Sequence, residues 1–168
     1  MKRLAVYFSV LVGCLFIGLT TYYMVKNYEC ITINYPSADE LGLDAIYLNV
    51  GEETNLEISH TRKQTQLHSS LTNQDIISFD LETGKIVALA AGETEILITT
   101  ENENYGPFNF KIKVGNGSSE APYYIKSEAD LRAIGGTRTY GEGNSATWSA
   151  SANYKVLCDI NLTEGEWE

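Results

Sequence analysis

The residues best suited to chemistry lie in one polar stretch that contains both histidines of the chain, His60 and His68. A metal site would need further ligands close by, but the intervening Arg62 and Lys63 are positively charged and cannot coordinate a cation. The pattern is more typical of histidines exposed in a loop. It gives no metal-ligating candidate.

Other patterns that can carry chemistry are incomplete. Ser69 and Ser70 lie beside a histidine, but neighbours in sequence are no evidence for a nucleophile and its base. The stretch YGEGN (140–144) has glycines but lacks the Lys-Ser/Thr pair of a phosphate loop. The acidic pairs at 52–53 and 101–103 lack the alternating Asp/Asn series of a calcium loop, so we expect solvated acidic turns. The sequence therefore provides no catalytic, cofactor-binding or metal site residue, and no cofactor.

The three cysteines match no metal-binding spacing. Cys14 lies in an apolar run, whereas Cys30 and Cys158 are far apart in the chain. A Cys30–Cys158 disulfide is one interpretation, and a pair of unlinked thiols is the preferred one.

Charge restricts the partners. The formal net charge is −10, and all 22 acidic residues follow residue 28. Such a surface repels nucleic acid and anionic lipid headgroups. The composition therefore predicts an exported surface with no nucleic-acid partner.

The first thirty residues predict a membrane partner. Residues 4–25 carry no charge, and a helix of that length, at about 1.5 Å per residue, matches the hydrocarbon core of a bilayer. Lys2 and Arg3 precede the run and only Lys26 follows it, which places the N-terminus in the cytoplasm and the remainder outside. We therefore expect a single-pass signal anchor over residues 1–29.

Two alternatives to the anchor also export the chain. A cleaved signal peptide would have a shorter apolar region and a small-residue cleavage site. LVGC (Leu11 to Cys14) resembles a bacterial lipobox, which implies lipidation of Cys14, but the apolar LFIGL follows where that family has a polar segment.

The middle of the chain, residues 30–115, predicts an antiparallel β-sandwich. Short runs of alternating apolar residues are separated by turns such as Asp80–Gly84, without helical periodicity between them. The polar stretch 60–75 is expected to be a loop with at most one irregular strand. The expected core positions are Phe79, Ile86, Leu89, Ile96, Ile98, Phe110 and Ile112.

One part of this region carries a family resemblance. The stretch DIISFDLETGKIVALAAGETEILITT is similar to the second half of the bacterial immunoglobulin-like domain, group 2. The matching positions are Ile76, Ile77, Phe79, Gly84, Ile86, Val87, Leu89, Ala90, Gly92 and Ile96. The resemblance covers roughly residues 30 to 115 and implies a spacer or adhesive module on a bacterial surface. A cell-wall or host-surface ligand is the partner that this implies.

The C-terminal residues differ in pattern. Residues 116–122 are rich in Gly, Ser and Pro and predict a linker. A helix of about two turns is expected to start at Ser127 and to stop at Gly135–Gly136. The polar stretch 137–152 predicts a loop, and 153–162 predicts one or two strands. Because few side chains of the linker can pack, residues 123–168 are not expected to dock firmly on the sandwich.

Residues 123–168 resemble the opening of a right-handed parallel β-helix of bacterial surface proteins with GLUG-type repeats. The matching positions are Ile125, Asp130, Leu131, Tyr154, Val156, Asp159, Ile160, Leu162 and Trp167. A single coil cannot bury its own face, so we expect Leu131, Val156 and Leu162 to be partly exposed in a truncated β-helix.

The sequence thus predicts a non-enzymatic, membrane-anchored extracellular surface protein of mainly β structure. The alternative is an enzyme. Parallel β-helices host polysaccharide-acting enzymes, and the chain would then supply only the anchor and the first cap, with the catalytic coils beyond it.

Overall fold

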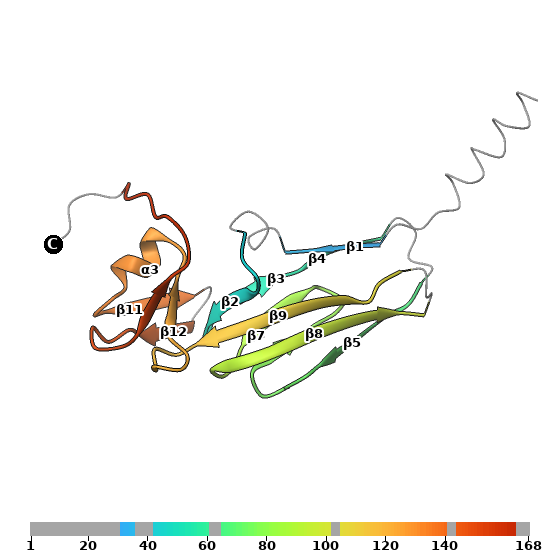
Figure 1. Cartoon of the computed structure of the whole chain (residues 1–168), viewed down its shortest axis with the longest axis horizontal. Helices are drawn as coiled ribbons and strands as arrows, with labels where there is room; N and C mark the ends of the chain where they lie inside the picture. Colours follow the sequence, from blue (N-terminus) through green and yellow to red (C-terminus); the bar gives the residue numbers. More distant parts are fainter. Residues whose placement is uncertain (1–30, 36–41, 61–64, 102–104, 141–143, 164–168) are drawn as a thin grey trace, which may run out of the picture. The chain divides into compact units, whose positions relative to one another are not determined.

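A computed structural model describes residues 31–35, 42–60, 65–101, 105–140 and 144–163. Apart from Ile31 and His60, these residues lie within one compact unit formed by Thr32–Ser59 and Thr65–Glu168. The described part of the chain is mainly β, as the sequence predicts, with several sheets and one short helix (Figure 1). Among the described residues, no helix is both long and apolar enough to cross a bilayer. The predicted anchor, with Cys14 and Cys30 at or beside it, lies outside the described residues.

The largest sheet has four strands in the order β2-β9-β8-β5. The central pair, β8 and β9, is antiparallel and long, and β5 adds antiparallel to β8 at one edge. At the other edge β2 runs parallel to β9. The bounds are β2 (Ile46–Asn49), β5 (Leu67–Leu71), β8 (Gly92–Thr100) and β9 (Phe108–Gly115).

Alternation along β8 explains why this segment forms a strand with one buried face. Ile96 and Ile98 are fully buried, whereas Leu97 between them is 36% exposed. Successive side chains of a strand point to opposite faces, so this period-two pattern matches a half-buried sheet. The expected burial of Ile96 and Ile98 is confirmed.

A second sheet has the order β3-β7-β6, and a separate pair is formed by β1 and β4. The turn between β6 and β7 is held by Asp80, whose carboxylate accepts hydrogen bonds from the Glu82 amide and the Thr83 hydroxyl. Gly84 ends it with φ of +71°, and a Cβ there would lie 2.1 Å from the Leu56 carbonyl oxygen. The bounds are β1 (Ile31–Asn34), β3 (Glu53–Asn55), β4 (Glu57–His60), β6 (Ile77–Phe79) and β7 (Lys85–Ala88).

One expectation for this region holds only in part, and another is wrong. The stretch 60–75, expected to be a loop with at most one irregular strand, contains one strand, β5, which is regular and pairs with Ile96–Thr100. It is an edge strand with mostly exposed side chains, so its polar residues give no alternating signal. Leu89 is 50% exposed because β7 ends at Ala88 and the inward alternation stops there.

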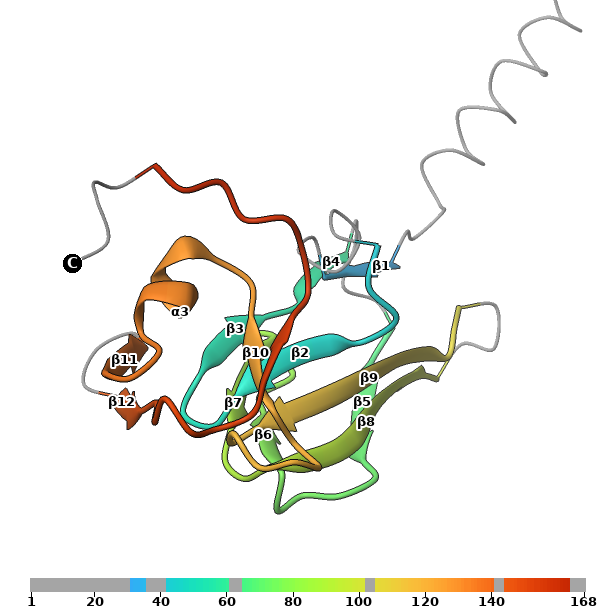
Figure 2. The ribbon, with the colours of Figure 1, turned by 60° about the vertical axis from the view of Figure 1, so that its left-hand side comes forward.

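The C-terminal part is built from a parallel strand pair, a short helix and a hairpin (Figure 2). Strands β10 and β13 are parallel, with Tyr123 opposite Tyr154. Ser127 caps the helix by accepting a hydrogen bond from the Asp130 amide, as predicted, although the helix is only five residues long. The bounds are β10 (Tyr123–Ile125), α3 (Glu128–Arg132), β11 (Thr137–Tyr140), β12 (Asn144–Thr147) and β13 (Tyr154–Val156).

The prediction of a loop at 137–152 is wrong, because β11 and β12 pair antiparallel there. Trp148, which follows β12, is fully buried and stacks on Tyr123 with ring centroids 4.6 Å apart. It belongs to a local core with Ile125, Ala133 and Tyr140. Val156 and Leu162 are 58% and 53% exposed, which agrees with the prediction for these two side chains.

Candidate functional site

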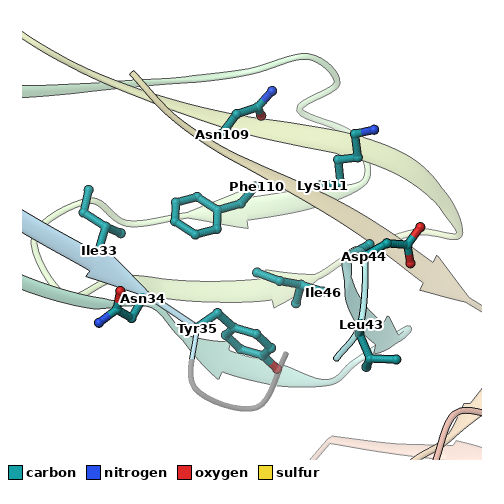
Figure 3. Close-up of a pocket in the computed structure, with 10 residues that line it drawn as sticks. Ile33, Asn34, Tyr35, Leu43, Asp44, Ile46, Asn109, Phe110 and Lys111 are labelled. Carbon is teal, nitrogen blue, oxygen red and sulfur yellow. The ribbon is translucent and has the colours of Figure 1, made fainter. Parts of the chain in front are cut away.

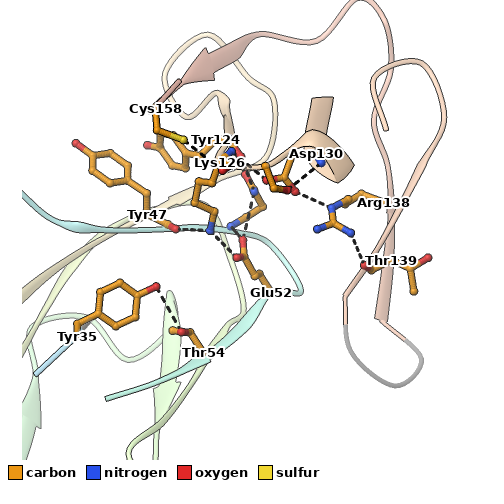
Figure 4. A network of polar contacts seen from close by, with 12 residues as sticks. Tyr35, Tyr47, Glu52, Thr54, Tyr124, Lys126, Asp130, Arg138, Thr139 and Cys158 are labelled. Carbon is orange, nitrogen blue, oxygen red and sulfur yellow. Dashed lines mark hydrogen bonds and ion pairs between the residues drawn. The ribbon is translucent and has the colours of Figure 1, made fainter. Parts of the chain in front are cut away.

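In the part of the chain that the structure describes, a network of polar side chains links the four-stranded sheet to the C-terminal part (Figure 4). It is here called the polar junction. Its members are Asn49, Glu52, Tyr124, Lys126, Asp130 and Arg138. Asn49 is fully buried at the end of β2. Its Oδ1 accepts a hydrogen bond from the Tyr124 amide at 2.8 Å, and its Nδ2 donates to the Tyr124 carbonyl at 3.0 Å. The Asn49 amide therefore satisfies both backbone groups of a residue 75 positions away.

Glu52 and Lys126 form the charged part of the polar junction. The Lys126 Nζ donates to Glu52 Oε1 and, at 2.8 Å, to the Tyr47 carbonyl oxygen. The other carboxylate oxygen of Glu52 accepts from the Asn49 backbone amide at 2.9 Å. Both charged side chains are only 19% exposed, and each has a direct partner. Burial of such charges is tolerated because they are paired and hydrogen-bonded.

A second ion pair lies beside the helix. Asp130 is 3% exposed, and its Oδ1 accepts from Arg138 Nε at 2.6 Å. Its Oδ2 accepts from the Lys126 backbone amide at 3.0 Å. The carboxylate therefore connects the helix, the β11 strand and the segment after β10.

An apolar cluster backs the polar junction. Ala45, Tyr47 and Tyr124 are buried together, with Leu43 and Leu157 packed against them. The Tyr47 and Tyr124 rings meet edge to face with centroids 4.8 Å apart, a favourable geometry for aromatic pairs.

The Tyr47 hydroxyl titrates abnormally in this cluster. Burial and the hydrogen bond that it donates to Asp44 raise the pKa of Tyr47 to about 12. The same hydrogen bond lowers the pKa of the exposed Asp44 carboxyl. Lys113 and Lys155 lie 5.6 Å and 5.4 Å from the centroid of the Tyr47 ring. Both lysines therefore add cation–π attraction to the Tyr47 ring, Lys113 from β9 and Lys155 from β13.

Two buried polar atoms lack hydrogen-bond partners in the part of the chain that the structure describes: the Tyr140 hydroxyl and the Trp148 Nε1. Burial, with the nearby Glu52 and Asp130 carboxylates, raises the pKa of Tyr140 well above its ordinary value. The Tyr140 hydroxyl therefore keeps its proton to a higher pH than an ordinary tyrosine does.

The expectation that residues 123–168 do not dock firmly is wrong. The physical reason is that the Gly/Ser-rich segment forms a tight turn, in which the Asn116 and Gly117 amides both donate to the Ala121 carbonyl. Gly115 permits this turn, since a Cβ there would lie 1.9 Å from the Pro122 carbonyl oxygen. The contacts of the polar junction then hold β10 against β2. The segment boundaries given above remain predictions.

A pocket of about 280 Å³ lies at the other end of β2, between β1 and β9, and is here called the edge pocket (Figure 3). Its lining is mixed: six of the ten lining residues are apolar or aromatic, and four are polar or charged. It is lined by Ile33, Asn34, Tyr35, Leu43, Asp44, Ala45, Ile46, Asn109, Phe110 and Lys111. No Ser, Cys or His lines the pocket, and its mixed lining could accept a small side chain.

The positions screened from the sequence do not converge on a site. His60 lies on β4. His68 lies on β5, and its Nε2 is 3.8 Å from Oε1 of Glu101. The side chains of His68 and Glu101 are exposed. Ser69 and Ser70 are exposed on the same strand. Across the described ranges, no three His, Cys, Asp or Glu side chains are grouped to hold a metal ion.

Other screened residues have structural roles. Cys158 is a free thiol whose Sγ donates to the Lys126 carbonyl at 3.3 Å. Glu52 is not the solvated turn residue that the sequence suggested, because its carboxylate enters the polar junction. Its neighbour Glu53 is more exposed and pairs with Lys85 at 2.8 Å.

Sequence reasoning missed the polar junction altogether. The one available signal was Asn49, a polar residue at the end of the otherwise apolar run AIYLNV, but its partner is remote in sequence. Comparison with known proteins adds no assignment: no protein-family model matches the chain, and no curated protein matches it.

Proposed function

We propose that the chain is a non-enzymatic extracellular surface protein, anchored in the membrane by residues 4–25, that acts as a spacer or adhesive module. Its Ig-like sandwich belongs to the group 2 bacterial type, and its C-terminal part is the opening of a parallel β-helix. The proposal combines the uncharged N-terminal run with the two β-structured parts and the contacts between them.

The strand order supports the Ig-like assignment. Strands β3 and β4 are separated only by Leu56, so β1, β4/β3, β7 and β6 follow one another in lateral order. The other sheet is β2-β9-β8-β5. The two sheets therefore contain the same sets of strands as the two sheets of an Ig sandwich. The first strand of that sandwich corresponds to β1 in one sheet and β2 in the other.

The parallel pairing of β10 and β13 supports the β-helix assignment. Tyr123 lies opposite Tyr154, so the chain between β10 and β13 makes one turn and brings β13 alongside β10 in the same direction. Parallel strands require such a crossover connection. Exposed Val156 and Leu162 are apolar positions that a following coil would cover.

The observation that carries the spacer function is the polar junction. A spacer must keep a fixed relation between its parts, and a flexible linker could not do so. The buried Asn49 fixes the backbone of Tyr124, and the partly buried Lys126–Glu52 pair adds a second link. This arrangement resists bending, because breaking any of these contacts would leave a buried polar group unpaired.

Topology is the property that tests this proposal most directly. The full chain carrying a C-terminal epitope tag would be expressed in bacteria, and intact cells would be treated with protease. We expect loss of the tag from intact cells and its retention in the membrane fraction of untreated cells. Protection of the tag, with a cytoplasmic marker equally intact, would overturn the export claim.

Two variants separate the forms of anchoring. Leu15→Lys places a charge in the middle of the apolar run and should release or block the chain, whereas Lys26→Ala should leave it in the membrane. Cys14→Ser should have no effect on an anchor but should abolish membrane retention of a lipoprotein. Membrane fractionation reads out all three variants.

A further inference from the structure

The edge of the four-stranded sheet next to the edge pocket is incompletely paired. Strand β9 spans Phe108–Gly115, but β2 pairs only with Ile112–Gly115. Within the described residues, no strand pairs with Phe108–Lys111 on that side. Among the described residues, the first half of β9 therefore has one edge without a paired strand.

Two hydrogen bonds show which backbone groups of β9 point towards β8 and which point towards the side of β2. The Gly115 carbonyl accepts from the Val50 amide, so the peptide groups of Gly115 face β2. On β8 the Glu95 carbonyl accepts from the Thr72 amide and faces β5, so Ile96 faces β9. Since direction alternates along a strand, Asn109 and the Lys111 amide face the open edge.

The edge pocket lies along this open edge. Figure 3 shows the Phe110 ring on one side of β9 and the side chains of Asn109 and Lys111 on the other. Phe110 and Tyr35 are half-buried, while Ile33 and Ile46 are buried. A pocket with both apolar and polar lining therefore lies beside the backbone donors and acceptors of Asn109 and Lys111.

We propose that this edge binds an extended peptide segment of a partner protein by strand addition to β9, with one bulky apolar side chain of the peptide in the edge pocket. The backbone of the peptide would hydrogen-bond to Asn109 and Lys111, which gives affinity with little sequence preference. The pocket would give specificity, as in other cases of strand addition. This inference goes beyond the proposed spacer function and does not depend on the anchor.

The pocket volume and the charge of the chain indicate the chemistry of the partner. The pocket volume of about 280 Å³ accommodates a single leucine or phenylalanine side chain, not a large ligand. The net charge of −10 favours a segment with lysine or arginine on its flanks, because long-range attraction speeds encounter.

Binding of defined peptides to the full chain in detergent tests the proposal. The probes are fluorescein-labelled peptides of nine residues. Each has lysine at both ends and threonine at alternate positions, and its central residue is phenylalanine, leucine or alanine. A fourth peptide has the phenylalanine sequence with N-methyl groups on alternate peptide bonds, which removes donors but retains the side chains. Fluorescence anisotropy measures each affinity.

We expect the phenylalanine or leucine peptide to bind at least tenfold more tightly than both the alanine and the N-methylated peptides. Asn109→Pro removes one donor that faces the open edge while leaving the β8 ladder intact, and should weaken binding at least tenfold. Leu97→Ala, on the exposed face of β8, is the matched control and should change affinity less than twofold.

Three results would overturn the proposal. Absence of binding by every peptide would remove the strand-addition site. Equal binding of the plain and N-methylated peptides would mean that the pocket takes a side chain or small apolar ligand without strand addition. A dimer detected by light scattering and dissolved by Asn109→Pro, together with no peptide binding, would show that the occupant is a second copy of this chain.

Discussion

Replacing Asn49 by alanine should release the C-terminal part from the four-stranded sheet. The side chain is fully buried, and it hydrogen-bonds both the amide and the carbonyl of Tyr124. In Asn49→Ala these two backbone groups lose their partners in a dry environment. Each buried unsatisfied group costs about 1–3 kcal/mol, so the loss of two partners should lower the free energy of unfolding by about 2–6 kcal/mol.

The assay combines urea unfolding with amide hydrogen exchange on the full chain. Urea unfolding followed by circular dichroism gives the change in free energy. Exchange at the Tyr124 amide reports the junction itself, because this group is the donor to Asn49 Oδ1. We expect exchange there to accelerate more than exchange at Ile96, which lies in the centre of β8.

The matched control is Asn109→Ala, which shortens an exposed asparagine whose one side-chain hydrogen bond, to Glu95, is 3.4 Å long. Its effect should stay within about 0.5 kcal/mol, as for other surface changes. If Asn49→Ala behaved like this control and left the Tyr124 amide protected, the polar junction would not hold the two parts together.

Three further predictions concern the core, the glycine turn and alkaline pH. Ile96→Ala should lower the free energy of unfolding by about 2–5 kcal/mol because this side chain is fully buried, whereas half-exposed Leu97→Ala should cost under about 1 kcal/mol; urea unfolding of both variants compares them, and equal costs would mean that the facing of β8 is misassigned. Gly115→Ala should cost about 1–3 kcal/mol, since its Cβ would lie 1.9 Å from the Pro122 carbonyl oxygen; a neutral result in thermal unfolding would show that the turn relaxes freely. The free energy of unfolding should fall as pH rises from 10 towards 12, because unfolding returns the raised pKa of Tyr47 to its ordinary value near 10 and the unfolded chain then loses its proton first. Urea midpoints across this pH range measure the decline, Tyr47→Phe should make it shallower, and an unchanged slope in that variant would contradict the assignment.

Local features were determined by the sequence itself. The alternation around Ile96 and Ile98 predicted a strand and its buried face, since side-chain direction in a strand depends only on neighbouring residues. The same holds for the turn at Asp80 and the helix cap at Ser127, where the hydrogen bonds join residues at most three positions apart.

Edge strands and the hairpin were decided by tertiary structure. The polar residues of β5 and of β11–β12 form strands because neighbouring strands supply the hydrogen bonds, although their side chains show little alternation. Trp148 is buried because Tyr123, which is distant in the chain, stacks on its ring, with Tyr154 packed beside both.

The polar junction and the edge pocket depended most on the fold. Asn49 and Tyr124 are 75 positions apart, and neither residue type identifies the other as a partner. The edge pocket exists because β9 extends beyond β2, a difference in strand pairing rather than a motif. Short-range alternation and capping determined the elements, whereas long-range burial and hydrogen bonding determined how they join and where a partner could bind.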